Sequence, residues 1–174
     1  MIILAQIVGI IAILIDLYSI QKKEKNNILK IQILSTSAYA IQYSLLKAFA
    51  GVIPDVVTII RNIIFIKIGE NKAKSSKIIP IFFTLLILVL GMITYVDYFS
   101  IIPIGLSIIY TVAAWQNNTK LIRISYIFCA ILWIIYNIHI CAYVAIIGNI
   151  FAIISGIISI NRYKDEEKSM KIEI

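Results

Sequence analysis

Seven apolar runs, each long enough to cross a lipid bilayer, constrain this chain more than any other feature of its sequence. They cover residues 2–20, 28–46, 50–68, 78–96, 100–116, 121–138 and 141–160. A membrane-spanning helix needs about 20 apolar residues. A backbone surrounded by lipid must also satisfy its polar groups within the segment. We therefore predict an all-α membrane protein with seven transmembrane helices, short connections and the lipid bilayer as its main partner.

The remaining composition excludes several function classes. Hydrophobic residues make up 61% of the 174 residues, whereas about 45–50% is usual for soluble domains. One histidine (His139) and two cysteines (Cys129 and Cys141) provide neither a disulfide framework nor a zinc-ligand pattern. No glycine-rich phosphate loop is present, and Asp16 and Asp55 fall towards opposite membrane faces. We expect no enzyme activity, no metal and no cofactor.

Basic residues predict the orientation of the chain. Fifteen of the sixteen Lys and Arg residues lie in or beside the first, third and fifth connections and the C-terminal tail, and Lys47 is the exception. Because cytoplasmic loops carry an excess of Lys and Arg, the N-terminus is expected outside and the C-terminus in the cytoplasm. The net charge of +7 is then a property of these loops and does not indicate nucleic-acid binding.

The sequence also contains an internal repeat. Residues 17–57 align with residues 111–151, at an offset of 93 to 95. The alignment pairs Gln21 with Gln116, Lys30 with Arg123, Tyr43 with Tyr136, and Asp55 with Asn149. It predicts a three-helix repeat over 1–77, a linker helix over 78–98, a second three-helix repeat over 99–163 and a charged tail over 164–174. An odd number of linking helices keeps the two repeats parallel.

Three segments carry a family resemblance: "VGIIAILIDLYSIQKK", "YAIQYSLLKAFAG" and "IIRN". They resemble the YgjV-like bacterial inner-membrane proteins, within the SWEET and PQ-loop transporter superfamily. The resemblance implies an inner-membrane location, a 3+1+3 helix arrangement, and one polar side chain from the third helix of each repeat facing the substrate cavity. The superfamily often has proline before the glutamine that ends the first and fifth helices. This chain has Ile20-Gln21 and Trp115-Gln116 there.

The stretch "IPDVVTIIRN", residues 53–62, places charge inside an apolar run. Asp55, Thr58 and Asn62 share one helix face, and intramembrane charges usually face the protein interior. A substrate-binding role is therefore expected for these three residues. The structural alternative is an Asp55 near the outer interface and an Arg61 that snorkels to the cytoplasmic side.

Other candidates lie on neighbouring helices. Asn149, at the repeat position of Asp55, is a second binding candidate or a simple interhelical hydrogen-bond partner. Trp133 and Asn137 suit a sugar or nucleoside through stacking and hydrogen bonding, or belong to an interfacial aromatic belt. Gln21 and Gln116 are expected near an inner gate. Asp16 is either a gate or ion site, or a carboxylate solvated near Lys22 and Lys23.

Two functions remain open on these observations. The first is a SWEET-like facilitator that moves a small polar solute, such as a sugar or nucleoside, by alternating access. The second is a non-transporting accessory or sensory subunit that keeps the same fold, which the missing prolines favour. The sequence is also compatible with a homo-oligomer.

Overall fold

The computed structural model describes residues 2–68, 77–116 and 118–172, with side chains described as far as Tyr163. Lys72 and Lys74 of the third connection lie outside the described residues, as do the side chains of Lys164, Lys168 and Lys171 in the tail. Within this part of the chain all regular structure is helical.

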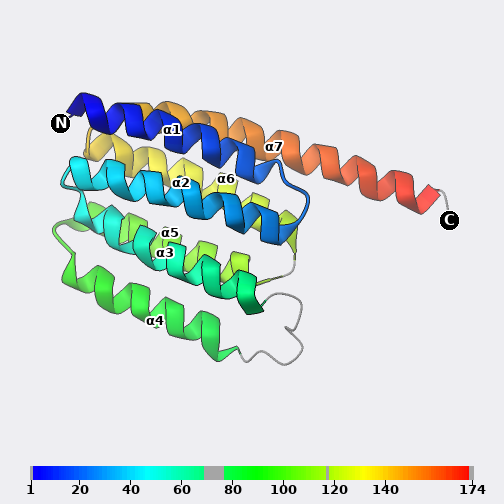
Figure 1. Ribbon diagram of the computed structural model, residues 1–174, viewed down its shortest axis with the longest axis horizontal. Helices are drawn as coiled ribbons and strands as arrows, with labels where there is room; N and C mark the ends of the chain where they lie inside the picture. Colours follow the sequence, from blue (N-terminus) through cyan, green and yellow to red (C-terminus); the bar gives the residue numbers. More distant parts are fainter. Residues whose placement is uncertain (1, 69–76, 117, 173–174) are drawn as a thin grey trace.

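Seven α-helices run side by side as a bundle (Figure 1). Their bounds are α1 Ile2–Ile20, α2 Lys25–Leu45, α3 Phe49–Ile68, α4 Ile78–Ile93, α5 Ile101–Trp115, α6 Thr119–His139 and α7 Tyr143–Ile172, with a short 3₁₀ helix η2, Tyr98–Ser100, before α5. The two termini lie at opposite ends of the bundle. Each helix coincides with one of the seven apolar runs, and α7 continues into the charged tail.

Five of these described helices are long and apolar enough to cross a membrane: α1, α3, η2 with α5, α6, and α7 as far as Tyr163. The helix α4 is apolar but has only 16 residues. The helix α2 has the length but carries many polar residues, among them Lys30, Gln32 and Gln42. Gln32 and Gln42 are buried, so α2 turns part of its polar side into the bundle.

The helices other than α4 close into a ring. In order around it, α1 contacts α2, α2 contacts α3, α3 contacts α5, α5 contacts α6, α6 contacts α7, and α7 contacts α1. The helix α4 packs on α3 and α5 at the edge of the bundle (Figure 1). Lipid-facing isoleucines and phenylalanines cover the outside, while the interior holds the buried polar side chains.

The second half of the ring repeats the first at an offset of 94 residues. Both α2 and α6 have 21 residues, and they begin at Lys25 and Thr119. The following helices begin at Phe49 and Tyr143, again 94 apart. Lys47 and Cys141 (141 − 47 = 94) both adopt the left-handed conformation, with φ of 59° and 57°. The next N–H donates over 2.9 Å to the carbonyl of Tyr43 in the first turn and of Asn137 in the second.

This register corrects part of the alignment made from the sequence. It keeps the pairing of Asp55 with Asn149, but it pairs Tyr43 with Asn137 and not with Tyr136. It likewise pairs Leu29, and not Lys30, with Arg123. Burial agrees with the corrected register, since Leu29 and Arg123 are both buried and Lys30 is exposed. The sequence alignment is wrong by one residue at these two positions. It matched tyrosine with tyrosine and lysine with arginine, and did not follow the helical periodicity.

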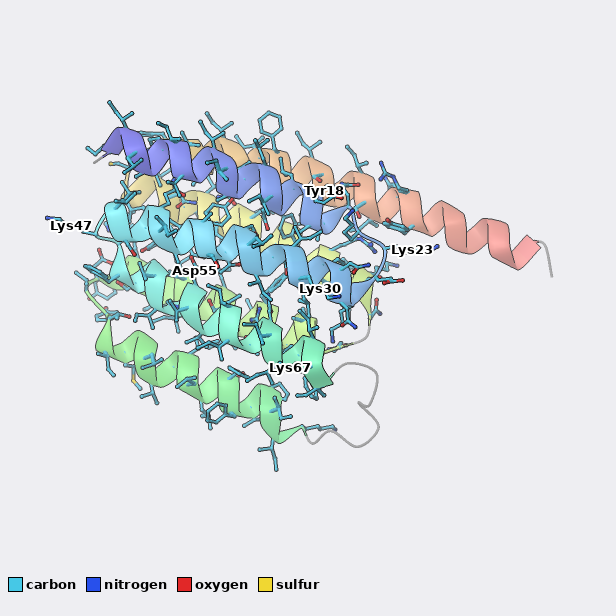
Figure 2. All side chains as sticks on the ribbon, in the orientation of Figure 1. Tyr18, Lys23, Lys30, Lys47, Asp55 and Lys67 are labelled. Atoms are coloured by element: carbon cyan, nitrogen blue, oxygen red, sulfur yellow. The ribbon has the colours of Figure 1, made fainter. Side chains whose placement is uncertain are left out.

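The labelled lysines of Figure 2 lie at the two ends of the bundle. Lys23, Lys30 and Lys67 lie at the end from which α7 extends, and Lys47 lies at the other end. At the Lys47 end, His139 closes α6 with Nε2 2.6 Å from Asp97 Oδ2, and its ring stacks on Phe99. Desolvation acts to raise the pKa of Asp97, but the hydrogen bonds from His139 and Ser100 outweigh it and hold that pKa below its usual value.

Glycines bring α7 close to its neighbours. A methyl group added at Gly148 would overlap Cγ1 and Cδ1 of Ile13 on α1, and one added at Gly156 would overlap Ile127 on α6. By contrast, a methyl group added at Gly105 on α5 would have no neighbour within 4 Å. The Gly148 and Gly156 positions are therefore close-packing contacts of the ring, in the way small residues serve other membrane helices.

We expect Gly148→Ala to be less stable than Gly105→Ala by about 1–3 kcal/mol, because only the first overpacks a helix contact. Both substitutions gain the same helix propensity of about 1 kcal/mol, so the difference between them isolates the α1–α7 contact. Thermal unfolding of both variants in detergent measures it. Equal stability of the two variants would contradict the close approach of α7 to α1.

Candidate functional site

A cavity of about 130 Å³ lies inside the ring. All six ring helices contribute to its lining, and α4 contributes none of the described lining residues. One buried water needs about 10–15 Å³ of such space, so the cavity can hold several water molecules or a small solute. Polar and aromatic side chains form much of its wall, in the middle of an otherwise apolar bundle.

The two halves of the chain line this cavity with equivalent positions. Seven lining residues come from the first half, and each has a counterpart 94 residues later that also lines the cavity. The pairs are Asp16 and Tyr110, Gln32 and Tyr126, Thr36 and Ala130, Tyr39 and Trp133, Tyr43 and Asn137, Asp55 and Asn149, and Thr58 and Ala152. Equivalent residues thus face one space from opposite sides.

Hydrogen bonds follow the same relation. The Gln32 amide donates to the Tyr110 hydroxyl over 2.6 Å, joining α2 to α5. At the equivalent place Tyr126 donates to Asp16 Oδ2 over 2.6 Å, joining α6 to α1. The Tyr43 hydroxyl donates over 3.3 Å to Asn137 Oδ1, so two counterpart residues bond directly to one another.

Asp16 belongs to the cavity and not to the lysine-rich end. Its Oδ1 accepts from Ser35 over 3.2 Å, in addition to the bond from Tyr126 at Oδ2. The expected solvation of Asp16 near Lys22 is wrong, since the Lys22 amine instead donates to the Tyr18 hydroxyl. Asp16 and Asp55 also line the same cavity, so the assumption that they face separate membrane surfaces does not hold.

Asp55 has a buried carboxylate oxygen, Oδ2, that has no hydrogen-bond partner among the described residues. Figure 2 shows the residue between the two bundle ends marked by Lys47 and Lys67. The Asn149 side chain lines the same cavity, but no described hydrogen bond joins the two. The two residues thus line one cavity without a hydrogen bond between them.

An aromatic wall accompanies the carboxylates. The ring of Tyr43 stacks on Trp133, with centroids 5.8 Å apart and planes 13° apart, and Tyr39 stacks on Tyr43 at 6.2 Å. Trp133 and Asn137 thus lie inside the ring, and the interfacial-belt interpretation does not describe them. Asn137 is buried and bonded to Tyr43.

Arg61 is buried beside the cavity. Its Nη1 donates to Thr111 Oγ1 over 2.7 Å, and its Nε and Nη2 both donate to Asn62 Oδ1 over 3.2 and 2.9 Å. The guanidinium lies 5.7 Å from the Tyr110 ring centroid. The snorkelling interpretation is therefore wrong, because the charged group bonds within the bundle. Asn62 is engaged by Arg61 and does not line the cavity, although Thr58 does.

The two glutamines expected at a gate lie directly after helix ends. Gln21 follows α1 and donates from Nε2 to Ser155 Oγ over 2.7 Å and to the Ser155 carbonyl over 3.0 Å. Gln116 follows α5 and is exposed. Both lie outside the cavity lining. Gln21 fastens the end of α1 to α7, which is a contact that an opening movement at this end would have to break.

Sequence reasoning missed most of the cavity on α2. Gln32, Thr36, Tyr39 and Tyr43 recur at spacings of four, three and four, which is one face of a helix. The same spacing links their counterparts on α6. A helical-phase count of polar and aromatic residues in these two segments would have found this face before any alignment.

The comparison with known families fits this architecture. The family model described as Imp-YgjV, a bacterial inner membrane protein, matches residues 3–167. The chain belongs to the Imp-YgjV family. As a member of it with several membrane-length apolar helices, the protein is a multi-pass protein of the bacterial inner membrane. Neither a curated protein nor a solved structure matches the chain.

Within this Imp-YgjV chain, Arg61→Lys is expected to lower stability by about 1.5–3 kcal/mol, the usual value of a hydrogen bond to a charged group. Lysine cannot reproduce a planar fork to Asn62 and Thr111 at once. The matched control, Arg162→Lys, changes an exposed arginine on α7 and should stay within about 0.5 kcal/mol of the parent. Thermal unfolding in detergent distinguishes them, and a fully tolerated Arg61→Lys would restore the snorkelling interpretation.

Proposed function

We propose that this protein is a SWEET-like facilitator that moves a small polar solute across the inner membrane by alternating access. In this proposal α1–α3 and α5–α7 are parallel repeats, α4 is the linker of a 3+1+3 arrangement, and the family belongs to the SWEET and PQ-loop superfamily. The observation that carries the proposal is the central cavity, whose seven first-half lining positions each have a lining counterpart 94 residues later.

The helix contacts support two equivalent bodies. The α1–α2 and α2–α3 contacts of the first triplet correspond to the α5–α6 and α6–α7 contacts of the second. The two contacts between triplets, α3 with α5 and α7 with α1, also correspond to one another. Parallel repeats of this kind rock about a shared axis in known transporters, with the substrate site between them.

The polarity of the cavity supports solute binding over simple packing. Burying an unpaired polar group costs about 2–7 kcal/mol, yet Asp55 Oδ2 and Gln32 Oε1, which belong to lining residues, are buried without partners among the described residues. Water and solute are the remaining partners. Typical pockets for drug-sized ligands measure about 300–1,000 Å³, so a sugar or nucleoside would require the triplets to separate further.

Solute uptake into reconstituted vesicles tests the proposal. For a solute that the protein carries, Asp55→Asn and Asn149→Ala should each lower uptake at least about tenfold, since a lost contact of about 1.4 kcal/mol has that effect. The matched control is Asn161→Ala, which changes an exposed asparagine on the same helix as Asn149 and should leave uptake unchanged.

A screen covering sugars, nucleosides and small amines without uptake of any of them would contradict the transport proposal. It would favour the non-transporting accessory or sensory subunit, in which the Gln21–Ser155 bond keeps α1 and α7 together. Loss of folding in both cavity variants, with non-additive destabilisation in the double variant, would likewise indicate a structural role for the pair.

We also propose that the N-terminus lies outside and the C-terminus in the cytoplasm. The support is the shared end of Lys23, Lys30 and Lys67 in Figure 2, since positive residues favour the cytoplasmic side.

A topology reporter fused after Ile174 is expected to give a cytoplasmic signal, because the lysine-rich end of the bundle is the end from which α7 extends. A reporter inserted in the 97–100 connection should give an external signal. Reporter activity in whole cells measures both. A cytoplasmic signal at 97–100 would reverse the orientation.

A further inference from the structure

The halves of the cavity match in position but differ in charge. The first half places carboxylates at Asp16 and Asp55, and the second places the neutral groups of Tyr110 and Asn149 at the equivalent positions. No lysine, arginine or histidine is among the described residues that line the cavity. Both acidic residues of the described lining thus come from the first half of the chain, and the second half has neutral groups at the equivalent positions.

The two carboxylates are not equally satisfied. Asp16 accepts a hydrogen bond from Tyr126 on one oxygen and from Ser35 on the other. The Oδ2 atom of Asp55 is buried and has no hydrogen-bond partner within the part of the chain that the structure describes. An ionised carboxylate only accepts hydrogen bonds, and an uncompensated one in apolar surroundings is costly. A cation in the cavity would satisfy Asp55 directly.

The nearby guanidinium does not supply that cation. Arg61 donates hydrogen bonds from Nη1 to Thr111 and from Nε and Nη2 to Asn62. Among the described residues no ion pair joins it to a carboxylate, and it does not line the cavity. Its neighbours hold it at the α3–α5 contact, so Arg61 does not act as the counter-ion of Asp55.

The rest of the wall favours an organic cation over a metal ion. Tyr39, Tyr43 and Trp133 form a stacked series on the cavity wall, and Tyr110 and Tyr126 also line the cavity. Aromatic faces attract ammonium groups, most strongly where water is excluded. Hard metal ions prefer six or more oxygen ligands, and no group of three or more His, Cys, Asp or Glu that could hold one occurs among the described residues.

We propose that the cavity binds a small organic ammonium ion, with Asp55 as its counter-ion and the stacked rings of Tyr43 and Trp133 as its aromatic wall. Asn149, which lines the same cavity, can accept from or donate to a polar group elsewhere on the solute. This assignment names the substrate class of the proposed transporter. Its transport step rests on the proposed function, whereas binding of the ammonium ion can be measured by itself.

Two pairs of probes of equal shape test it by calorimetry on the protein in lipid nanodiscs. Ethanolamine is compared with propan-1-ol, a pair that differs in the ammonium charge and its N–H donors, and choline with 3,3-dimethylbutan-1-ol, a pair that differs in charge alone. At least one ammonium ion should bind at least about tenfold more tightly than its neutral partner. Asp55→Asn and Trp133→Leu should each weaken its binding by at least about tenfold, while Asp97→Asn, an aspartate outside the cavity, should have no effect.

The outcomes separate binding from transport. Neutral probes that bind as tightly as both ammonium ions, or unchanged ammonium affinity in a folded Asp55→Asn protein, would overturn the inference. The inference would also be overturned if sodium chloride stabilised the protein against thermal unfolding and neither ammonium ion did. Uptake of glucose or uridine without ammonium binding would overturn it and leave the transport proposal intact. Charge-selective binding without uptake would support it and remove the transport proposal.

Discussion

The need to pair every polar group inside an apolar bundle determines how this protein is organised. Lipid offers no hydrogen bonds, so the backbone must be helical and polar side chains must turn towards one another. Three hydrogen bonds between different helices join such side chains: Tyr126 to Asp16, Gln32 to Tyr110, and Arg61 to Thr111. Two of the buried polar atoms that have no partner among the described residues, Asp55 Oδ2 and Gln32 Oε1, belong to residues that line the cavity.

Residues 94 positions apart meet at the cavity, and one such pair, Tyr43 and Asn137, bonds directly. The proposed parallel repeat accounts for this arrangement, because two similar three-helix units place equivalent residues around a common axis. Each half has also changed what it places at those positions. Asp16 and Asp55 provide charge, while Tyr110 and Asn149 provide neutral hydrogen-bonding groups. In our interpretation the shared geometry forms the site, and the divergence sets what it binds.

Helix number and bounds could be predicted because apolar length is a local property of the sequence. The inward position of the 53–62 stretch could be predicted because charge in lipid is costly. The partners of Arg61 and Asp16 could not, since Thr111 and Tyr126 are 50 and 110 residues away and no spacing rule joins them. The one-residue slip at Tyr43 had a different cause, because residue identity was weighed above helix phase. A slip of one residue turns a side chain by about 100° around the axis of an α-helix.

Thiol labelling tests whether the middle of the ring is wet and accessible to solute. In a background with Cys129→Ala and Cys141→Ala, a small water-soluble maleimide should react with Thr58→Cys, because Thr58 lines the cavity. It should not react with Ile60→Cys, two residues along α3 on the exposed, lipid-facing side. Labelling of both or of neither, in folded protein within a membrane, would contradict a water-filled cavity between the two triplets.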